Sequence, residues 1–387
     1  MAARHPNDDS DESFMRRALS LARRGRGFTS PNPMVGAVLV RDGTIIGRGW
    51  HRRAGLPHAE IEMLNQCHRR GISTRGATLF VTLEPCCTHG RTPPCTDSII
   101  AARIRRVVVG AIDPNPLHAG RGLDLLRNAR IRVTNGVLAS ESNRLNEAFN
   151  HWIVQQTPFV TAKVAMTLDG KIATADGNSH WITSSAARRH AMQLRASADA
   201  ILVGIGTVLA DDPALTIRQT APGGKERVTA RRRIILDRRA RSPLNSRLLT
   251  DAFADQTVVV VGQSAPSRAT AAIEKKVTLL RAPEREGRIN LEWLLNRLGR
   301  DGITSLLVEG GGEVHASFFA AQAVQRIAFY YAPTVLGGRN ARKAVAGEGA
   351  HDLKTAWALT HPEWESVGPD LFVTAIVGSD SFHRRGA

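Results

Sequence analysis

The residues best suited to chemistry in this chain are His58, Glu60, Cys86 and Cys95. A catalytic zinc site takes three protein ligands and keeps one coordination position open for water. A neutral imidazole from His58 and thiolates from Cys86 and Cys95 would supply the three ligands. The metal would then lower the pKa of its water toward neutrality. We therefore predict that the first half of the chain binds Zn2+ as a cofactor.

Glu60 follows His58 by two positions, which places its carboxylate near the metal but free to move protons. His-x-Glu followed by Pro-Cys-x-x-Cys is typical of zinc-dependent nucleobase deaminases, in which the glutamate is the general acid and base. This chain departs from the pattern, because eight residues separate Cys86 from Cys95 and Cys87 adds a competing thiol. The alternative is a closed structural zinc site with His89 or Cys87 as fourth ligand, which leaves Glu60 without a role.

The length and composition favour a globular protein of two domains. The chain has 387 residues, of which 42% are hydrophobic, and this is long for a single core. No apolar run approaches the roughly 18 residues of a membrane span, and the polar start is unlike a secretory signal. The four cysteines lie between Cys67 and Cys95, too few and too clustered for a disulfide framework. We therefore expect a protein of the reducing cytoplasm.

A formal net charge of +17 suits either nucleic acid or phosphorylated small molecules. Aromatic residues make up only 5% of the chain, so platforms for stacking single-stranded bases are sparse. We expect a solvated basic surface and a phosphorylated small-molecule substrate, with neither nucleic acid nor membrane as partner. The sequence leaves open whether the protein is a homo-oligomer.

Alternating helices and strands must position the zinc residues, which indicates an α/β fold. The apolar pattern predicts helices over residues 13–25, 58–64 and 96–102 and strands over 35–40, 44–47, 77–83 and 106–111. His58 and the segment with Cys95 then fall where helices begin. A helix N-terminus favours negative charge and so helps to hold thiolates.

A helix over residues 141–155 is expected to end before Pro158, which places a domain boundary after residue 156. Beyond it we predict strands over 159–166, 200–203, 233–237, 257–261 and 305–309, a helix capped by Thr183 that runs to Arg195, and a polar loop over 220–232. The run from Glu309 to Gly312 closes a strand and opens a helix, where backbone amides suit a phosphate or form an ordinary tight turn. Neither this run nor Gly204-x-Gly206 completes a Rossmann fingerprint, so a nicotinamide cofactor would need another fold.

Several segments resemble the bifunctional deaminase/reductase of riboflavin biosynthesis. The deaminase half is similar at residues 30–36 (SPNPMVG), 84–95 (EPCCTHGRTPPC) and 113–116 (DPNP), and the reductase half at 166–171 (MTLDGK), 180–183 (HWIT), 208–216 (VLADDPALT) and 309–312 (EGGG). The resemblance covers nearly the whole chain in the family's order. It implies a cytidine-deaminase-like α/β/α domain over 1–156 and a dihydrofolate-reductase-like α/β domain over 157–387 that uses NADPH.

The resemblance implies two reactions. The first is zinc-dependent deamination of 2,5-diamino-6-ribosylamino-4(3H)-pyrimidinone 5′-phosphate, with Glu60 as the proton shuttle. The second is NADPH-dependent reduction of the ribosyl side chain to ribityl. Candidate contacts to the pyrimidine or the ribose phosphate are Asn32, His51, Asp113 and Asn115, although Asn and Asp beside proline are also common turn formers. His89 and Arg91, inside the zinc loop, would either reach the substrate phosphate or hold the loop.

In the reductase half, Lys163 lies on an expected strand, where a buried lysine is uncommon, and we predict that it polarises the ribose carbonyl. We group Glu309 with it as catalytic. The resemblance assigns substrate contacts to Ser179, Arg195, Leu215, Arg218 and Glu309, of which the arginines suit a phosphate. It assigns NADPH contacts to Ala165, Trp181, Thr207, Asp211, Arg238, Gly311 and Gly312.

Two other functions remain as alternatives. One is a tRNA or nucleobase deaminase with an appended RNA-binding domain, which the charge supports and the ordered reductase-like segments oppose. The other is a non-enzymatic zinc-binding module for nucleic acid, whose binding would depend strongly on salt.

Overall fold

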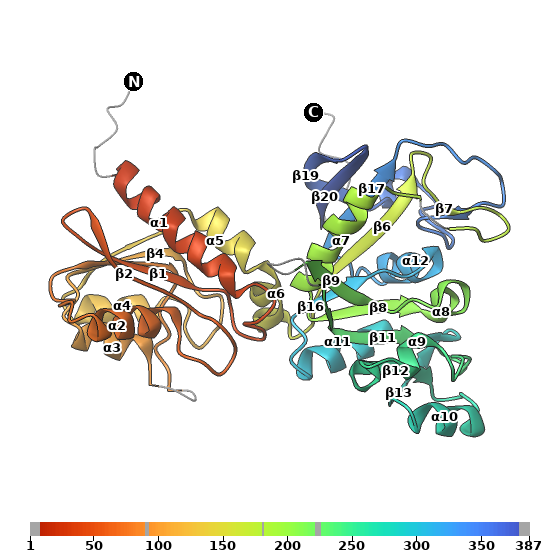
Figure 1. Ribbon diagram of the computed structural model, residues 1–387, viewed down its shortest axis with the longest axis horizontal. Helices are drawn as coiled ribbons and strands as arrows, with labels where there is room; N and C mark the ends of the chain where they lie inside the picture. The colour runs from red at the N-terminus through yellow and green to blue at the C-terminus, as the bar shows by residue number, and fades with distance from the viewer. Residues whose placement is uncertain (1–7, 90–92, 180–181, 221–225, 379–387) are drawn as a thin grey trace. The chain divides into compact units, whose positions relative to one another are not determined.

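The computed structural model describes residues 8–89, 93–179, 182–220 and 226–378 (Figure 1). The chain divides into two compact units, Met1–Gln156 and Thr157–Ala387. Within the described residues, no helix has both the length and the apolar character that crossing a membrane requires. The predicted Trp181 and Arg91 contacts lie outside the described residues.

The first unit is built on a five-stranded sheet in the order β2-β1-β3-β4-β5. Strand β1 pairs antiparallel with β2 and β3, while β3, β4 and β5 are parallel. The strands are β1 (Gly36–Arg41), β2 (Thr44–Trp50), β3 (Thr78–Leu83), β4 (Arg106–Ala111) and β5 (Arg132–Asn135). The parallel half aligns the C-terminal ends of β3 and β4, where ligand sites of α/β sheets commonly form.

Helices cover both faces of this sheet, so the unit is an α/β/α sandwich (Figure 1). Side chains along β1 alternate: Ala37 and Leu39 join one core and Val38 and Val40 the other, as the two-residue period of a strand requires. The first core takes residues from α2 (Ala59–Arg69), α3 (Cys95–Ala101) and α4 (Arg121–Asn128), and the second from α1 (Asp8–Ala22).

The single helix expected over residues 141–155 is two helices, α5 (Ala139–Leu145) and α6 (Glu147–Gln155). Between them, the side-chain oxygen of Asn146 accepts a hydrogen bond from the backbone of Met34 at 2.8 Å, and its nitrogen donates to the Met34 carbonyl at 3.0 Å. Asn146 thereby fixes the segment that carries Asn32. A contact over 112 positions is invisible to local periodicity.

The second unit contains a nine-stranded sheet in the order β13-β12-β11-β8-β16-β6-β17-β20-β19. The strands from β13 to β17 are parallel, and β20 and β19 add an antiparallel edge. Their bounds are β6 (Phe159–Thr167), β8 (Ala200–Gly204), β11 (Arg232–Leu236), β12 (Thr257–Gly262), β13 (Thr278–Ala282), β16 (Ser305–Val308), β17 (Arg326–Ala332), β19 (Ala358–Val367) and β20 (Asp370–Gly378).

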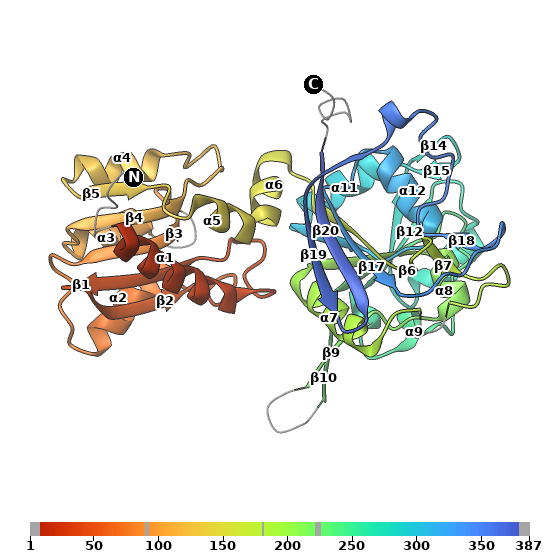
Figure 2. The ribbon, with the colours of Figure 1, turned by 90° about the horizontal axis from the view of Figure 1, so that it is seen from above.

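Helices α11 (Leu291–Arg300) and α12 (Gly312–Ala320) pack on one face of this sheet, and α7 (Ser185–Ser197), α9 (Arg247–Thr250) and α10 (Ser267–Glu274) on the other (Figure 2). Ser184, rather than Thr183, caps α7: its hydroxyl accepts a hydrogen bond from the backbone of Ala187. Helix α8 (Ile205–Asp211) follows β8 directly. Small ladders join β7 (Lys171–Ala173) to β18 (Arg342–Lys343) and β14 (Glu284–Arg285) to β15 (Arg288–Ile289).

The polar loop expected over residues 220–232 is in part a strand. Strand β10 (Glu226–Ala230) pairs antiparallel with β9 (Thr216–Thr220). The side chains of residues 226–228 are exposed, so the hairpin lacks the apolar alternation that reveals a half-buried strand.

Candidate active sites

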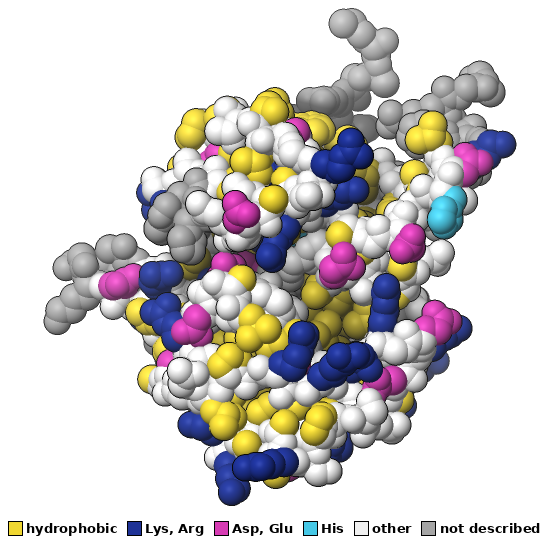
Figure 3. Space-filling view, turned by 90° about the vertical axis from the view of Figure 1, so that its right-hand side faces the viewer, with side chains coloured by type: hydrophobic (Ala, Val, Ile, Leu, Met, Phe, Trp, Pro, Cys, Tyr) yellow, Lys and Arg dark blue, Asp and Glu magenta, His cyan; other side chains and the backbone are white. Residues whose placement is uncertain are grey.

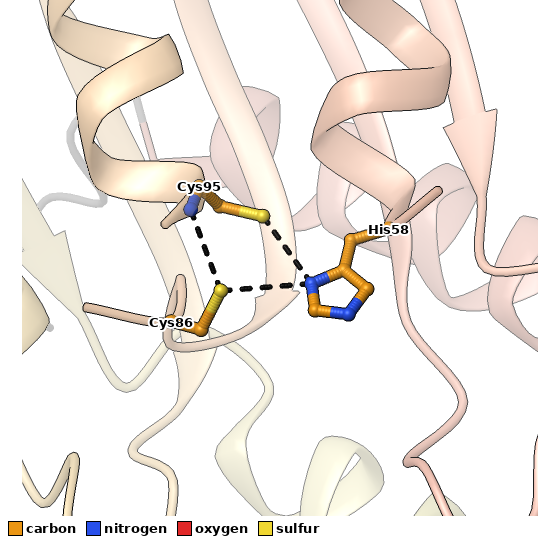
Figure 4. A group of neighbouring side chains, drawn as sticks. All are labelled: His58, Cys86 and Cys95. Atoms are coloured by element: carbon orange, nitrogen blue, oxygen red, sulfur yellow. Dashed lines mark hydrogen bonds between the residues drawn. The ribbon is translucent and has the colours of Figure 1, made fainter. Parts of the chain in front are cut away.

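His58, Cys86 and Cys95 converge in the first unit (Figure 4). His58 is the N-cap of α2, Cys86 follows the end of β3, and Cys95 is the first residue of α3. The Nδ1 atom of His58 lies 3.6 Å from the Cys86 Sγ and 3.4 Å from the Cys95 Sγ. The backbone N–H of Cys95 also donates to the Cys86 Sγ at 3.4 Å. Two thiols thus face one ring nitrogen at the start of two helices.

These side chains fit a zinc ion. Zn–S bonds of about 2.3 Å and Zn–N bonds of about 2.0 Å in a tetrahedron separate nitrogen from sulfur by roughly 3.6 Å, close to the distances found. No fourth His, Cys, Asp or Glu among the described residues joins the group. The Cys87 Sγ instead lies 3.4 Å from the His118 Nδ1, and His89 is exposed. The arrangement favours an open site over the closed alternative.

Helix α2 also places Glu60 in the site. A side chain at Gly49 of β2 would clash with the carbonyl of Ala59, so this glycine lets the first turn of α2 lie directly on the sheet. Glu60 is 3% exposed, and burial raises its pKa to about 7, with a further rise from the charge of Cys86. The hydrogen bond with Cys95 lowers the pKa of Cys86, and the thiolate is the form that binds metal.

Asn32 and His51 lie beside the metal cluster. The Asn32 Nδ2 is 3.1 Å from the His51 Nε2, and the His51 Nδ1 is 3.1 Å from the carbonyl of Pro57. The His51 ring meets that of His58 edge to face, with centroids 5.4 Å apart. These contacts fix both predicted substrate residues next to His58.

Asp113 and Asn115 lie in the loop after β4. Asp113 accepts a hydrogen bond from the backbone of Asn115 at 2.9 Å, and Asn115 accepts one from the backbone of Leu117 at 3.0 Å. Both side chains therefore form turns of their own loop, as Asx residues often do. Asp113 is buried, and burial raises its pKa.

A cavity of about 760 Å3 opens in the second unit, and the space-filling view shows a hollow with Lys and Arg side chains around it (Figure 3). Most of the predicted reductase residues line this cavity. They are Lys163, Ala165, Ser179, Arg195, Thr207, Asp211, Arg218, Glu309, Gly311 and Gly312.

A charged triad lines part of the cavity. Arg195 donates to Glu309 through Nε at 2.7 Å and through Nη2 at 3.0 Å, and the Lys163 Nζ lies 3.4 Å from the Glu309 Oε2. Burial by itself would raise the pKa of Glu309, but the charges of Arg195 and Lys163 outweigh it and lower the pKa to about 2. Glu309 is therefore a carboxylate that holds two cations in place.

The glycine run lies between β16 and α12. A side chain at Gly312 would clash with the carbonyl of Lys343, whereas a Cβ on Gly311 would meet only the Thr207 hydroxyl, at 4.0 Å. Gly311 has an ordinary backbone conformation as the N-cap of α12. Nearby, the Ser179 hydroxyl donates to Asp211 at 3.1 Å, which joins a predicted substrate contact to a predicted cofactor contact.

Two predicted contacts lie elsewhere. Leu215 is 3% exposed within a hydrophobic core and is not among the cavity-lining residues. Arg238 does not line the cavity either, and its Nη1 donates to Glu284 at 3.0 Å.

Several residues that line the cavity were not predicted from the sequence: Arg188, Tyr330, Arg342 and Lys343. Arg342 and Lys343 arrive through the pairing of β18 with β7. No local motif marks them, because the two paired strands are far apart in the sequence.

Two family models match the chain, one within each unit. Residues 8–111 match the cytidine and deoxycytidylate deaminase zinc-binding region, and residues 158–373 match the RibD C-terminal domain. Riboflavin biosynthesis protein RibD of Actinobacillus pleuropneumoniae is 41% identical over 368 residues, which cover 95% of this chain and 96% of that protein. The chain belongs to the RibD family.

Solved RibD structures have the same fold. RibD of Acinetobacter baumannii is 34% identical, with a TM-score of 0.82 over 96% of this chain and 99% of that chain. A diaminohydroxyphosphoribosylaminopyrimidine deaminase/5-amino-6-(5-phosphoribosylamino)uracil reductase of Thermotoga maritima is 34% identical, with a TM-score of 0.79 over 96% of this chain and all of that chain (100%). The predicted fold, a cytidine-deaminase-like domain followed by a reductase domain of the RibD type, is confirmed.

Proposed function

We propose that residues 1–156 deaminate 2,5-diamino-6-ribosylamino-4(3H)-pyrimidinone 5′-phosphate and that residues 157–387 then reduce its ribosyl side chain to ribityl. As a RibD protein, the chain is a bifunctional deaminase and reductase of riboflavin biosynthesis that uses zinc and NADPH. The observation that carries the residue-level assignment is the open cluster of His58, Cys86 and Cys95 with a buried Glu60 beside it.

In the deaminase, His58, Cys86 and Cys95 would hold zinc, which would supply a nucleophilic water at neutral pH. Glu60 would take a proton from the attacking water and pass it to the ring nitrogen, and would then move the proton of the newly added hydroxyl to the amino group that leaves as ammonia. Its burial keeps bulk water from competing for the proton. Asn32 and His51 orient the pyrimidine beside His58, and Asp113 and Asn115 complete the substrate site from the loop after β4.

In the reductase, NADPH supplies the hydride for the sugar carbonyl. Lys163 directs its ammonium at the carbonyl oxygen and stabilises the negative charge that develops there. Glu309 fixes the position of Lys163 and, through Arg195, joins β16 to α7. The backbone at Gly311 and Gly312 receives a cofactor phosphate at the start of α12.

The substrate and NADPH, the two molecules proposed to bind in this cavity, both carry phosphate. The cationic side chains that line the cavity differ in whether they already have a partner in the protein. Arg195 is engaged by Glu309 and also donates to the Thr216 carbonyl at 3.0 Å. The side chains of Arg218, Arg342 and Lys343 line the cavity and form no hydrogen bond or ion pair with any residue that the structure describes. We assign the phosphates to these three residues, with Arg195 as an organiser of the site.

The experiment is a reaction of the purified protein with the diaminopyrimidine phosphate, with and without NADPH. Ammonia release in the absence of NADPH, followed by oxidation of NADPH once the cofactor is added, supports the proposal. Absence of ammonia release by the zinc-loaded protein rejects it. We further propose that the protein acts in the cytoplasm and binds no nucleic acid. Tight, salt-dependent binding of tRNA would reverse the second statement. Light scattering on the same sample decides whether the protein is a homo-oligomer.

A further inference from the structure

Glu84 is a buried carboxylate for which the proposed reaction has no use. It follows β3, two positions before Cys86, and is 4% exposed. Its Oε1 accepts a hydrogen bond from the backbone of Gly122 at 2.8 Å. Its Oε2 accepts from Gly120 at 2.9 Å and from Asp113 at 3.2 Å. One side chain therefore binds three backbone N–H groups of a single segment, residues 113–122.

Such a set of bonds is a strong constraint on that segment. A buried carboxylate is costly unless it is hydrogen-bonded, and bonds to a charged acceptor are about twice as strong as neutral ones. Gly120 and Gly122 are at the start of α4, where amide groups have no partner within the helix and where negative charge is favoured. Losing the carboxylate would leave three amide groups without their acceptor.

The segment that Glu84 holds carries substrate-binding candidates. Asp113 and Asn115 lie in it, and His118 of the same segment contacts Cys87. The two segments also pack closely at Gly122. A side chain there would clash with the carbonyl of Pro85 and would lie 3.1 Å from the Glu84 Oε1. Residues 84–87, which include the ligand Cys86, are thus fixed against residues 113–122.

We propose that Glu84 is a positioning residue that holds the Asp113–Asn115 loop in register with the metal ligand Cys86. The inference rests on the proposed deaminase function and adds a residue to its machinery. A displacement of about 1 Å in a substrate-positioning group can lower an enzyme's rate by about a hundredfold. Glu84 thereby determines how the pyrimidine meets the metal site, without contacting the pyrimidine itself.

The test compares three variants of the full-length, zinc-loaded chain. Glu84→Gln removes one acceptor oxygen, and Gly122→Ala displaces the same contact without altering the carboxylate. Asp11→Asn is the matched control, because Asp11 is a partly buried acid of the same unit that binds Arg106 at 3.0 and 2.6 Å, away from this loop. Reduction of the separately prepared deaminated product by NADPH is an internal control, since that reaction belongs to the other unit.

We expect Glu84→Gln and Gly122→Ala to keep zinc and wild-type reductase activity, and to lower the deamination kcat/KM by about tenfold or more. Asp11→Asn should lower the thermal stability and leave that kcat/KM unchanged. The inference is overturned if Glu84→Gln and Gly122→Ala have the wild-type kcat/KM, if Asp11→Asn lowers it equally, or if Glu84→Gln and Gly122→Ala both lose zinc, since Glu84 would then support the ligand alone. Should Glu84→Gln fail to fold, Gly122→Ala decides. A wild-type protein that releases no ammonia would refute the proposed function instead.

Discussion

Arg195 and Glu309, 114 positions apart, form a two-pronged ion pair with distances of 2.7 and 3.0 Å. Lys163 completes it from the neighbouring strand at 3.4 Å. The carboxylate is therefore a fixed negative centre that sets the direction of two cations on the cavity wall.

This pair predicts a dependence of stability on pH. The pKa of Glu309 in the folded chain, about 2, is below its value of 4.5 without these partners. Its stabilising effect is therefore complete above pH 5 and is lost as the pH falls toward 2. Glu309→Gln should reduce this acid sensitivity and lower the free energy of unfolding near pH 7 by about 3 kcal/mol, because two largely buried cations lose their partner.

Denaturant unfolding of the full-length chain at several pH values, monitored through the loss of NADPH binding, measures both the acid sensitivity and the free energy of unfolding. Asp301→Asn is the matched control, since Asp301 forms a half-exposed pair with Arg297. If the two variants lose the same free energy at pH 7, the triad does not stabilise the fold as we describe.

Cys95 and Cys87 have different neighbours, which predicts different effects of replacing them. Cys95→Ser should lose zinc and deamination, because it removes one of three ligands. Cys87→Ser should keep both, because the Cys87 thiol faces His118. Zinc content per chain and ammonia release are the measurements, and the reverse pattern in the two variants would make Cys87 the ligand.

Glu60→Gln tests the proton shuttle. The amide preserves shape but neither accepts nor delivers the proton, so ammonia release should fall by about a hundredfold or more while zinc stays bound. NADPH oxidation with the deaminated product should be unchanged. Near-normal ammonia release by a zinc-loaded variant would remove Glu60 from this role.

Two neighbouring glycines give opposite expectations. Gly311→Val should fold, since the space around its Cβ is open, and should raise the NADPH dissociation constant by about tenfold by blocking close approach of the phosphate. Gly312→Ala should lower the stability, since its side chain would clash with the Lys343 carbonyl. Fluorescence titration with NADPH and thermal unfolding separate the two, and unchanged affinity in Gly311→Val places the phosphate elsewhere.

The sequence was informative where chemistry and spacing are local. His58 and Glu60 are two residues apart, and the predicted strand over 77–83 places Cys86 in the turn that follows that strand. Most helices and strands of the first unit also follow from periodicity, because each has one buried face.

What the sequence concealed depends on contacts between distant residues. Asn146 interrupts a helix by bonding to Met34, and Arg342 reaches the cavity wall only because β18 pairs with β7. The family resemblance, together with the charge and geometry of the guanidinium, predicts Arg195 at a phosphate. Its pairing with Glu309 is a tertiary fact, and so are the burial of Leu215 and the contact of Arg238 with Glu284.

We propose that two separate sites in one chain carry out two successive reactions. The most direct measurement follows ammonia and NADPH together in the Lys163→Ala protein supplied with the diaminopyrimidine phosphate. We expect ammonia release near the wild-type rate and no NADPH oxidation, because Lys163 lines the cavity of the second unit, whereas His58, Cys86 and Cys95 all belong to the first. Loss of both activities in a folded, zinc-loaded Lys163→Ala protein would contradict it.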